Sequence, residues 1–349
     1  MERNDVMNRD RVQWIDIAKG IAILLVAIGH YECSQNFRIW IYMFHMPLFF
    51  ILSGITFNVK KYTWKSFVVK KIKTLIIPWI LAVVPYILLG NLLVLMGGPG
   101  DNISISRIIP IIFIHIRNGT YDPLYWFVPC LFVVELVFFI LLKKFDSKKG
   151  TLFLMFVSFA IAMIYSTFIK RILIWEIDLV PVVSFFLLIG YYAKNYCTIF
   201  SNGRKKEIVI TIVLMSVGTG VGVANYMLSG SNVSFAGGRY GNFVFMIIAA
   251  VFISFSVIFL CRILSRLYLL QFIGRNSLYF YFAQPLAFKF VDVGLNMLLP
   301  FYNYASNMFN LILLHITSNI VIGIYVICYK KIKQSTKVIL AKQRGLKYE

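Results

Sequence analysis

Two histidines at membrane depth are the residues of this sequence whose positions point most clearly to chemistry. His30 lies near the end of the first long apolar run, and His45 lies in the second run, after the short turn 31–38. Because that turn makes the two runs antiparallel neighbours, both histidines are expected at a similar depth. Imidazole exchanges protons near neutral pH, so the two rings beside Glu32 predict an acid–base group. Two histidines at one depth beside Glu32 favour a functional role over a purely structural one.

The inner end of the first run carries a second pair of ionisable residues, Asp16 and Lys19. Residues three apart lie on one face of a helix, so the spacing predicts an ion pair. Each charge costs roughly 2.5–3.5 kcal/mol at the centre of a membrane helix, so its presence needs a local reason. Asp16 is about 21 Å from His30 along a helix, too far for its carboxylate to orient that imidazole. The pair is expected near the inner membrane face.

A lysine-rich segment follows the second run, with six lysines between Lys60 and Lys73. Its cations around Phe67 predict a basic amphipathic helix at the inner face. Such a helix is typical of attraction to anionic lipid headgroups, and it suits equally well an entry site for a phosphate-bearing cosubstrate. The segment by itself leaves both interpretations open.

The remaining histidines and the cysteines predict no further chemistry. His115 lies in a segment between apolar runs and is expected at the membrane interface, and His315 is expected to be structural. A zinc site would need three converging His or carboxylate ligands, and the spacing of the histidines is not that of a metal motif, so no metal is expected. The five cysteines are scattered, and an odd number argues against a disulfide framework.

The composition indicates which elements hold these residues. Of 349 residues, 60% are hydrophobic and 14% are charged, whereas soluble domains carry roughly 25% charged residues. Such a surplus of apolar side chains is typical of a protein whose exterior faces lipid. The net charge of +21 is spread over short loops between apolar runs, which excludes a nucleic-acid-binding face. The predicted fold class is all-α, a polytopic bundle of membrane helices.

About twenty apolar residues are needed to span a bilayer as a helix. The sequence therefore predicts about ten transmembrane helices, at residues 14–33, 39–58, 76–96, 124–142, 151–169, 177–193, 207–228, 242–263, 275–299 and 308–329. The apolar stretch 108–116 is too short to span and predicts an interfacial or re-entrant segment in the longest outer loop.

The loop charges predict the orientation of these helices. With the N-terminus inside, every second loop is rich in Lys and Arg, as the positive-inside rule requires. Both termini are therefore expected in the cytoplasm, residues 1–13 and the basic tail 330–349 flanking a single membrane domain. The opposite side has only six cations, namely Arg38, Arg107, Arg117, Lys170, Arg171 and Arg239.

Several motifs together resemble the membrane acyltransferase-3 family. The first run reads Arg11-x-x-Trp14-Ile-Asp16-Ile-x-Lys19-Gly20 and continues to Gly29-His30, like the first-helix signature of that family. The second run contains Phe44-His45-Met46-Pro47-Leu48-Phe49-Phe50 and Ser53-Gly54, which is similar to the second-helix motif. Shorter similarities follow at Lys73-Thr74-Leu75-Ile76-Ile77-Pro78, Tyr125-Trp126-Phe127-Val128 and Ile273-Gly274-Arg275-Asn276-Ser277-Leu278. The resemblance spans the chain.

The resemblance implies an enzyme of the bacterial cytoplasmic membrane that moves an acetyl or similar group from cytoplasmic acyl-CoA to a hydroxyl, often on a surface polysaccharide. His30 matches the essential histidine of the family, and His45 matches its second-helix histidine. The acyl-CoA phosphates are expected among Lys70, Lys71, Lys73 and Arg11, and the acceptor or its cavity beside Trp126, Asn276 and Gln284. Acetyl-CoA is then a cosubstrate, with no permanently bound cofactor, and the other expected partners are a glycan or sugar acceptor and membrane lipids.

One departure and one alternative stay open. The family often has a histidine where this sequence has Gln284, and a glutamine neither accepts nor releases a proton at neutral pH. That position therefore only forms hydrogen bonds, or the chemistry is altered. His30 is expected near the outer face, so either the pantetheine arm reaches deep into the bundle or a covalent carrier moves the acyl group. The alternative function is a transporter or flippase for a lipid-linked glycan or small solute. The sequence leaves the oligomeric state open.

Overall fold

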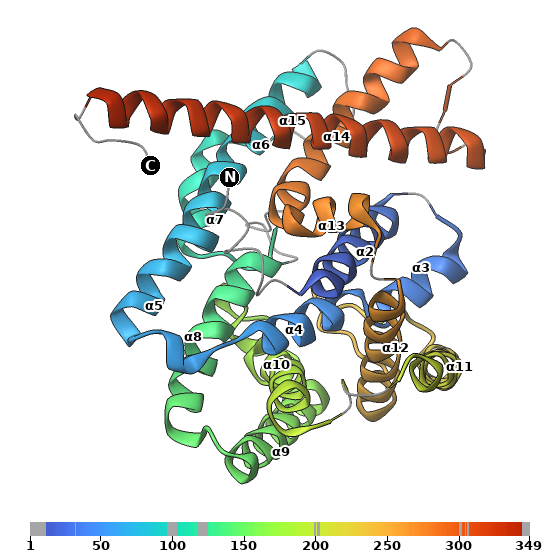
Figure 1. Ribbon diagram of the computed structural model, residues 1–349. Coiled ribbons are helices and arrows are strands. Elements are labelled where there is room, and N and C mark those ends of the chain that lie inside the picture. Colours follow the sequence, from blue (N-terminus) through green and yellow to red (C-terminus); the bar gives the residue numbers. More distant parts are fainter. Residues whose placement is uncertain are drawn as a thin grey trace.

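The structure, a computed structural model, describes residues 12–31, 33–95, 103–117, 125–198, 200, 203–264, 266–299, 302–303, 305 and 307–343, with side chains up to residue 336. In this part of the chain every regular element is a helix, and one isolated antiparallel bridge joins Ser234 to Arg239. Figure 1 shows the helices arranged as a bundle, with the long C-terminal helix lying across one end of it. The predicted all-α fold is confirmed.

The first half of the chain forms α2 (Gln13–His30), α3 (Gln35–Tyr42), α4 (His45–Thr56), η1 (Val59–Lys61), α5 (Trp64–Lys71), η2 (Ile72–Ile76), α6 (Ile77–Leu95), η3 (Ile105–Arg107), α7 (Ile108–Phe113) and α8 (Phe127–Phe145). The second half forms α9 (Lys148–Ile164), η4 (Tyr165–Ile169), η5 (Ile174–Leu179), α10 (Val180–Tyr196), α11 (Arg204–Ser229), α12 (Phe243–Ile263), α13 (Tyr268–Arg275), α14 (Ser277–Leu298) and α15 (Met308–Gln343).

Eight helices of the described chain are long and apolar enough to cross a membrane. They are Gln13–His30, Gln35–Thr56, Trp64–Leu95, Lys148–Ile169, Ile174–Tyr196, Arg204–Ser229, Phe243–Ile263 and Met308–Thr336. The other two predicted spans, 124–142 and 275–299, are also helical, as α8 and α14, but each carries charged side chains within the helix. A polytopic helix bundle is therefore confirmed, and the number of ten crossings stays a prediction.

Helices α4 and α10 cross at the centre of the core without space for a side chain between them. A Cβ atom on Gly54 would lie 2.0 Å from the carbonyl oxygen of Leu187, and one on Gly190 would lie 2.1 Å from that of Ile51. Small residues at helix contacts allow such close approach in membrane proteins, where dispersion and not the hydrophobic effect holds helices together. The position of α4 therefore depends on these two glycines.

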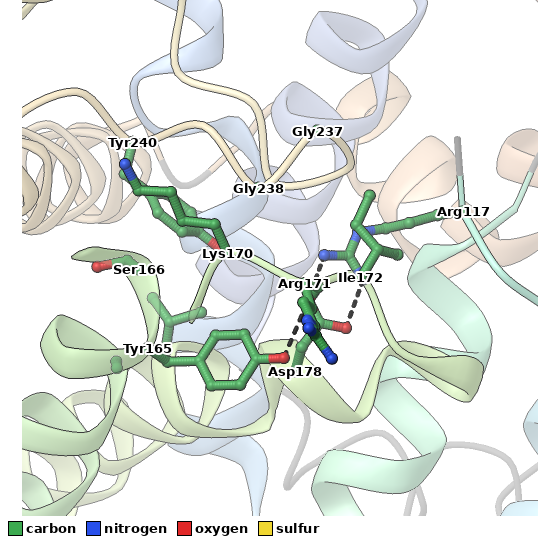
Figure 2. A pocket seen from close by; sticks show the side chains of 12 residues that line it. Arg117, Tyr165, Ser166, Lys170, Arg171, Ile172, Asp178, Gly237, Gly238 and Tyr240 are labelled. Carbon is green, nitrogen blue, oxygen red and sulfur yellow. Dashed lines mark hydrogen bonds and ion pairs between the residues drawn. The ribbon is translucent and has the colours of Figure 1, made fainter. Parts of the chain in front are cut away.

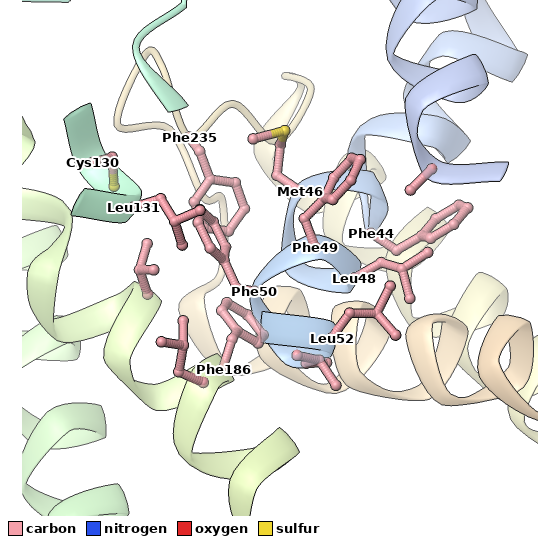
Figure 3. Packing of buried hydrophobic residues seen from close by; sticks show 14 of the residues in the cluster. Phe44, Met46, Leu48, Phe49, Phe50, Leu52, Cys130, Leu131, Phe186 and Phe235 are labelled. Carbon is pink, nitrogen blue, oxygen red and sulfur yellow. The ribbon is translucent and has the colours of Figure 1, made fainter. Parts of the chain in front are cut away.

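Loop 231–241, between α11 and α12, fills the core beside this crossing. The ring of Phe235 lies 6.3 Å from that of Phe50 in α4 and 6.1 Å from that of Phe186 in α10, measured between centroids. Figure 3 shows Phe235 packed against the same aromatic group. A loop that the sequence places on the outer side thus reaches into the middle of the bundle.

The segment after α7 also enters the bundle. The His115 ring lies 5.2 Å from the Trp79 ring, in α6. Trp79 is sixteen residues, roughly 24 Å, before the end of α6 at Leu95, from which the chain continues towards α7. The chain therefore runs back along α6 for most of the length of that helix. Whether residues 108–116 are interfacial or re-entrant with respect to the membrane stays a prediction.

Candidate functional site

His30 is the last residue of α2, which ends because Tyr31 has an extended backbone (φ −102°, ψ 166°). Helices α2 and α3 touch just before it, where the Tyr42 hydroxyl donates a 3.4 Å hydrogen bond to the Gly29 carbonyl oxygen. The His30 side chain is exposed, and it forms no hydrogen bond with a residue that the structure describes. An accessible imidazole on a well-packed helix end suits proton exchange with a bound substrate.

His45 is the first residue of α4, because the chain breaks at Met43 and Phe44. The kinked helix predicted over 39–58 is thus interrupted between α3 and α4, which together form one candidate span, and Pro47 lies in the first turn of α4, where its missing N–H is tolerated. The His45 Nδ1 atom lies 2.8 Å from the carbonyl oxygen of Ile41. Since a carbonyl only accepts hydrogen bonds, Nδ1 holds the proton of the neutral ring and Nε2 keeps the basic lone pair.

The structure brings the two histidines into one region. Tyr42 links them, because its hydroxyl bonds α2 and its ring lies 5.0 Å from the His45 ring. The imidazoles of His30 and His45 are close enough to interact electrostatically. Glu32 and Arg11, which the sequence assigned to this site and to acyl-CoA, lie outside the described residues. Among the residues whose side chains the structure describes, no three His, Cys, Asp or Glu lie close enough together to hold a metal ion.

The inner end of α2 is fixed by α13. Asp16 is buried, and its Oδ2 atom lies 3.1 Å from the Nε atom of Arg275. The two backbones are in contact, since a Cβ on Gly274 would lie 1.7 Å from the Asp16 carbonyl oxygen. The local spacing of Asp16 and Lys19 contained no sign of Arg275, which is 259 residues away. The ion pair between Asp16 and Lys19 stays a prediction.

The three lysines assigned to acyl-CoA have different surroundings. Lys70 is exposed and donates a 2.6 Å hydrogen bond to the Tyr62 hydroxyl, which lowers the pKa of Tyr62. Lys71 is mostly buried and forms an ion pair with the buried Glu135 of α8. Lys73 is exposed in η2, a turn of π-helix of the kind often found at functional sites. Lys70 and Lys73 are thus accessible, whereas Lys71 fastens the segment to α8.

The three residues expected near the acceptor have mainly packing contacts. Gln284 is buried and donates a 3.1 Å hydrogen bond to the Ile23 carbonyl oxygen, which joins α14 to the helix that carries His30. Asn276, between α13 and α14, donates a 2.7 Å hydrogen bond to the Phe272 carbonyl oxygen. Trp126 is half-buried at the start of α8. No described contact joins any of the three to the His30 ring.

Four ionisable side chains form a buried cluster that the sequence did not reveal. His115 Nε2 lies 3.1 Å from Glu176 Oε1, and both side chains are 0% exposed. Arg117 forms an ion pair with Asp178, and its Nε donates a 2.8 Å hydrogen bond to the Ala236 carbonyl oxygen. His115 is therefore enclosed by the protein, and its depth in the membrane stays a prediction. The only available signal was the concentration of outer-side cations at residues 117, 170 and 171.

The backbone around this cluster is strained. His115, Trp175 and Glu176 have φ values of 33°, 52° and 52°, in the left-handed region that non-glycine residues rarely adopt. Each such residue costs about 1–3 kcal/mol and persists where its surroundings hold it, often at binding and catalytic sites. The Trp175 amide donates to the His115 carbonyl oxygen at 2.9 Å, so the two strained segments hold one another.

These features describe a multi-pass membrane protein in which the exposed His30 and the buried His45 lie in one region and basic residues lie at the end of α5. A sequence model of the acyltransferase-3 family, described as an acyltransferase domain, matches residues 12–329, nearly the whole chain. The protein belongs to this family and is a membrane acyltransferase. No curated protein and no solved structure matches it.

Proposed function

We propose that this protein is a membrane O-acetyltransferase that transfers an acetyl group from cytoplasmic acetyl-CoA to a hydroxyl of a cell-envelope glycan or sugar precursor. Membership of the acyltransferase family supports the reaction class. The observation that carries the proposed mechanism is the accessible His30 ring, held by α2 in the same region as His45.

His30 acts as the general base in this mechanism. Its imidazole takes the proton of the acceptor hydroxyl while the hydroxyl oxygen attacks the thioester carbonyl carbon. The tetrahedral intermediate then collapses, forming the ester bond and breaking the carbon–sulfur bond. The CoA thiolate that leaves takes the proton back from the His30 imidazolium. The products are an acetyl ester and the CoA thiol, and His30 returns to its neutral form.

His45 orients or tunes this base. The carbonyl oxygen of Ile41 fixes the proton of the neutral ring on Nδ1, so Nε2 accepts a hydrogen bond within the site. A hydrogen-bond acceptor fixed in this way favours one orientation of a hydroxyl group or a protonated imidazole beside it. Glu32, which follows His30 by two residues, is the second candidate for this role.

The CoA phosphates bind at the opposite end of the site, on Lys70 and Lys73 with Arg11. Ammonium and guanidinium groups form strong charge-assisted hydrogen bonds with phosphate oxygens. Lys71 contributes by holding this segment against Glu135 of α8. The pantetheine arm then extends from η2 into the bundle towards His30.

The test is transfer of radiolabelled acetyl from acetyl-CoA to a pool of cell-envelope glycans by the purified protein in nanodiscs. General acid–base catalysis contributes about 10²–10⁴-fold, so His30→Ala should lower turnover at least about 100-fold. His30 is exposed and has no described hydrogen bond, so the variant should unfold at the wild-type temperature. Near-normal turnover by folded His30→Ala protein would remove His30 from the mechanism. If the wild-type protein neither binds nor consumes acetyl-CoA, the proposed function fails.

A further inference from the structure

A cleft of about 70 Å³ lies between three loops that are far apart in the sequence. It is lined by Arg117 from the segment after α7, by Lys170 and Arg171 after η4, and by Gly237 and Gly238 from loop 231–241. Figure 2 shows Tyr165 and Asp178 bordering the same space. One water needs roughly 10–15 Å³ on this measure, so the cleft accommodates several waters or one polar group of a ligand.

Cations outnumber carboxylates in this cleft. Arg117, Lys170 and Arg171 face one carboxylate, that of Asp178, so the lining has a net charge of +2. Arg117 is 1% exposed and its charge is matched by Asp178 behind the cleft. Lys170 and Arg171 are exposed, and neither forms an ion pair within the described part of the chain. Two cations are therefore available to a ligand.

Membrane orientation does not explain why these cations gather here. The sequence has six cations on the side predicted to be outer, and three of them line this one cleft. A fourth, Arg239, is nearby, because its Nε atom lies 3.2 Å from where a Cβ on Gly237 would be. Cations on the outer side act against the positive-inside bias. Because these cations converge from three loops, they need a local explanation, and binding of an anion provides one.

The loop that presents the two free cations is held in a fixed shape. Lys170 ends the π-helix η4 with a left-handed backbone (φ 51°). The Tyr165 hydroxyl donates a 2.8 Å hydrogen bond to the Arg171 carbonyl oxygen, and the Leu173 amide donates one of 3.1 Å to Asp178 Oδ1. Lys170 and Arg171 thus lie on a strained, hydrogen-bonded turn beside the buried ion pair. Strained backbone that is held in place in this way is common at binding sites.

We propose that this cleft binds the oxyanion, a carboxylate or phosphate, of an acidic acceptor glycan. Lys170 and Arg171 form charge-assisted hydrogen bonds with the oxyanion, and Tyr165 and Ser166 offer hydroxyls to the sugar. That the bound glycan is the acceptor of an acetyl group rests on the function proposed above. Loop 231–241 connects the two sites, since it lines the cleft and packs through Phe235 on α4, the helix that begins at His45.

The test compares binding of a soluble uronic-acid oligosaccharide with binding of its methyl ester, which lacks the negative charges. The protein is held in nanodiscs of zwitterionic lipid, and Kd is measured by microscale thermophoresis. The acid should bind at least about tenfold more tightly than the ester, and Arg171→Gln together with Lys170→Gln should abolish most of that difference. Arg107→Gln is the matched control, because Arg107 is an exposed outer-side cation that does not line the cleft.

Three outcomes would overturn the proposal. The first is equal binding of the acid and the ester by the wild-type protein. The second is an equal loss of the difference in Kd in Arg107→Gln. The third is loss of that difference when anionic lipid is added, which would assign the cleft to lipid phosphates. Failure of the proposed function is distinguishable. Acetyl-CoA consumption that depends on His30 tests the enzyme without the cleft, and oligosaccharide binding tests the cleft without acetyl-CoA.

Discussion

Replacing Gly54 with alanine should force α4 away from α10 and disturb the helix that begins at His45. The added Cβ would lie 2.0 Å from the carbonyl oxygen, 2.8 Å from the carbonyl carbon and 3.0 Å from the Cα of Leu187. All three are backbone atoms, so no rotation of a side chain relieves the overlap. Ordinary contact begins at 3.4 Å, so the helices must separate locally by about 1.4 Å.

The expected loss of stability follows from two opposing terms. Overpacking a well-filled contact costs about 1–3 kcal/mol, and contact with backbone atoms places Gly54→Ala at the upper end. Alanine is the better helix former by about 1 kcal/mol, which offsets part of this cost. The net expectation is a decrease of about 2 kcal/mol in the free energy of unfolding, with a lower rate of acetyl transfer because His45 moves with α4.

The measurement is chemical unfolding in nanodiscs or detergent, followed by tryptophan fluorescence, beside the labelled acetyl-transfer assay. Gly220→Ala is the control, because Gly220 lies within α11 and a Cβ there would meet nothing within 4 Å. That variant should be as stable as the wild type or more stable by up to about 1 kcal/mol. If Gly54→Ala unfolds at the wild-type midpoint, or if both variants lose the same stability, the close crossing of α4 and α10 is refuted.

Two further predictions concern the two faces of the protein. Glu176→Gln should lower the free energy of unfolding by about 1–3 kcal/mol, because it removes the carboxylate that contacts the fully buried His115; an unchanged thermal midpoint would contradict this. Lys73→Gln should raise KM for acetyl-CoA by about tenfold with little change in kcat, because it removes a phosphate contact made equally in the ground and transition states. Lys205→Gln is the control, because Lys205 is an exposed lysine in a different loop that is predicted on the same side. An equal change in KM in that variant would refute a specific contact between Lys73 and a phosphate.

The sequence predicted those parts of the fold that depend on local pattern. The lengths of the apolar runs predicted α2 and the other long helices, because a spanning helix must be both long and apolar. The nearness of His30 and His45 was also predictable, since only a short turn separates their runs. The position of the kink was not, because Pro47 suggested a kink at that residue, whereas the helix is interrupted earlier, at Met43 and Phe44.

Two buried ion pairs could not be predicted, since each joins residues far apart in the sequence. Asp16 and Arg275 come from opposite ends of the chain, and Arg117 and Asp178 are separated by 61 residues. Hydropathy marks apolar runs that cross the membrane, and it contains no signal for a polar loop that descends into the bundle. His115 was expected at the interface because the apolar stretch 108–116 that contains it is too short to span a bilayer.

The loops that enter the bundle change the geometry of the proposed reaction. Phe127, the first residue of α8, lies 5.3 Å from Phe50 between ring centroids, so α8 begins at the middle of α4. From there, Glu135 with its partner Lys71 is eight residues, about 12 Å, along α8, and His45 is five residues, about 7.5 Å, in the other direction along α4. The inner lysines and His45, which lies in the same region as the proposed base His30, are therefore separated by roughly 20 Å, less than the hydrocarbon thickness of about 30 Å. In the reaction proposed above, the pantetheine arm of acetyl-CoA covers that distance inside the protein.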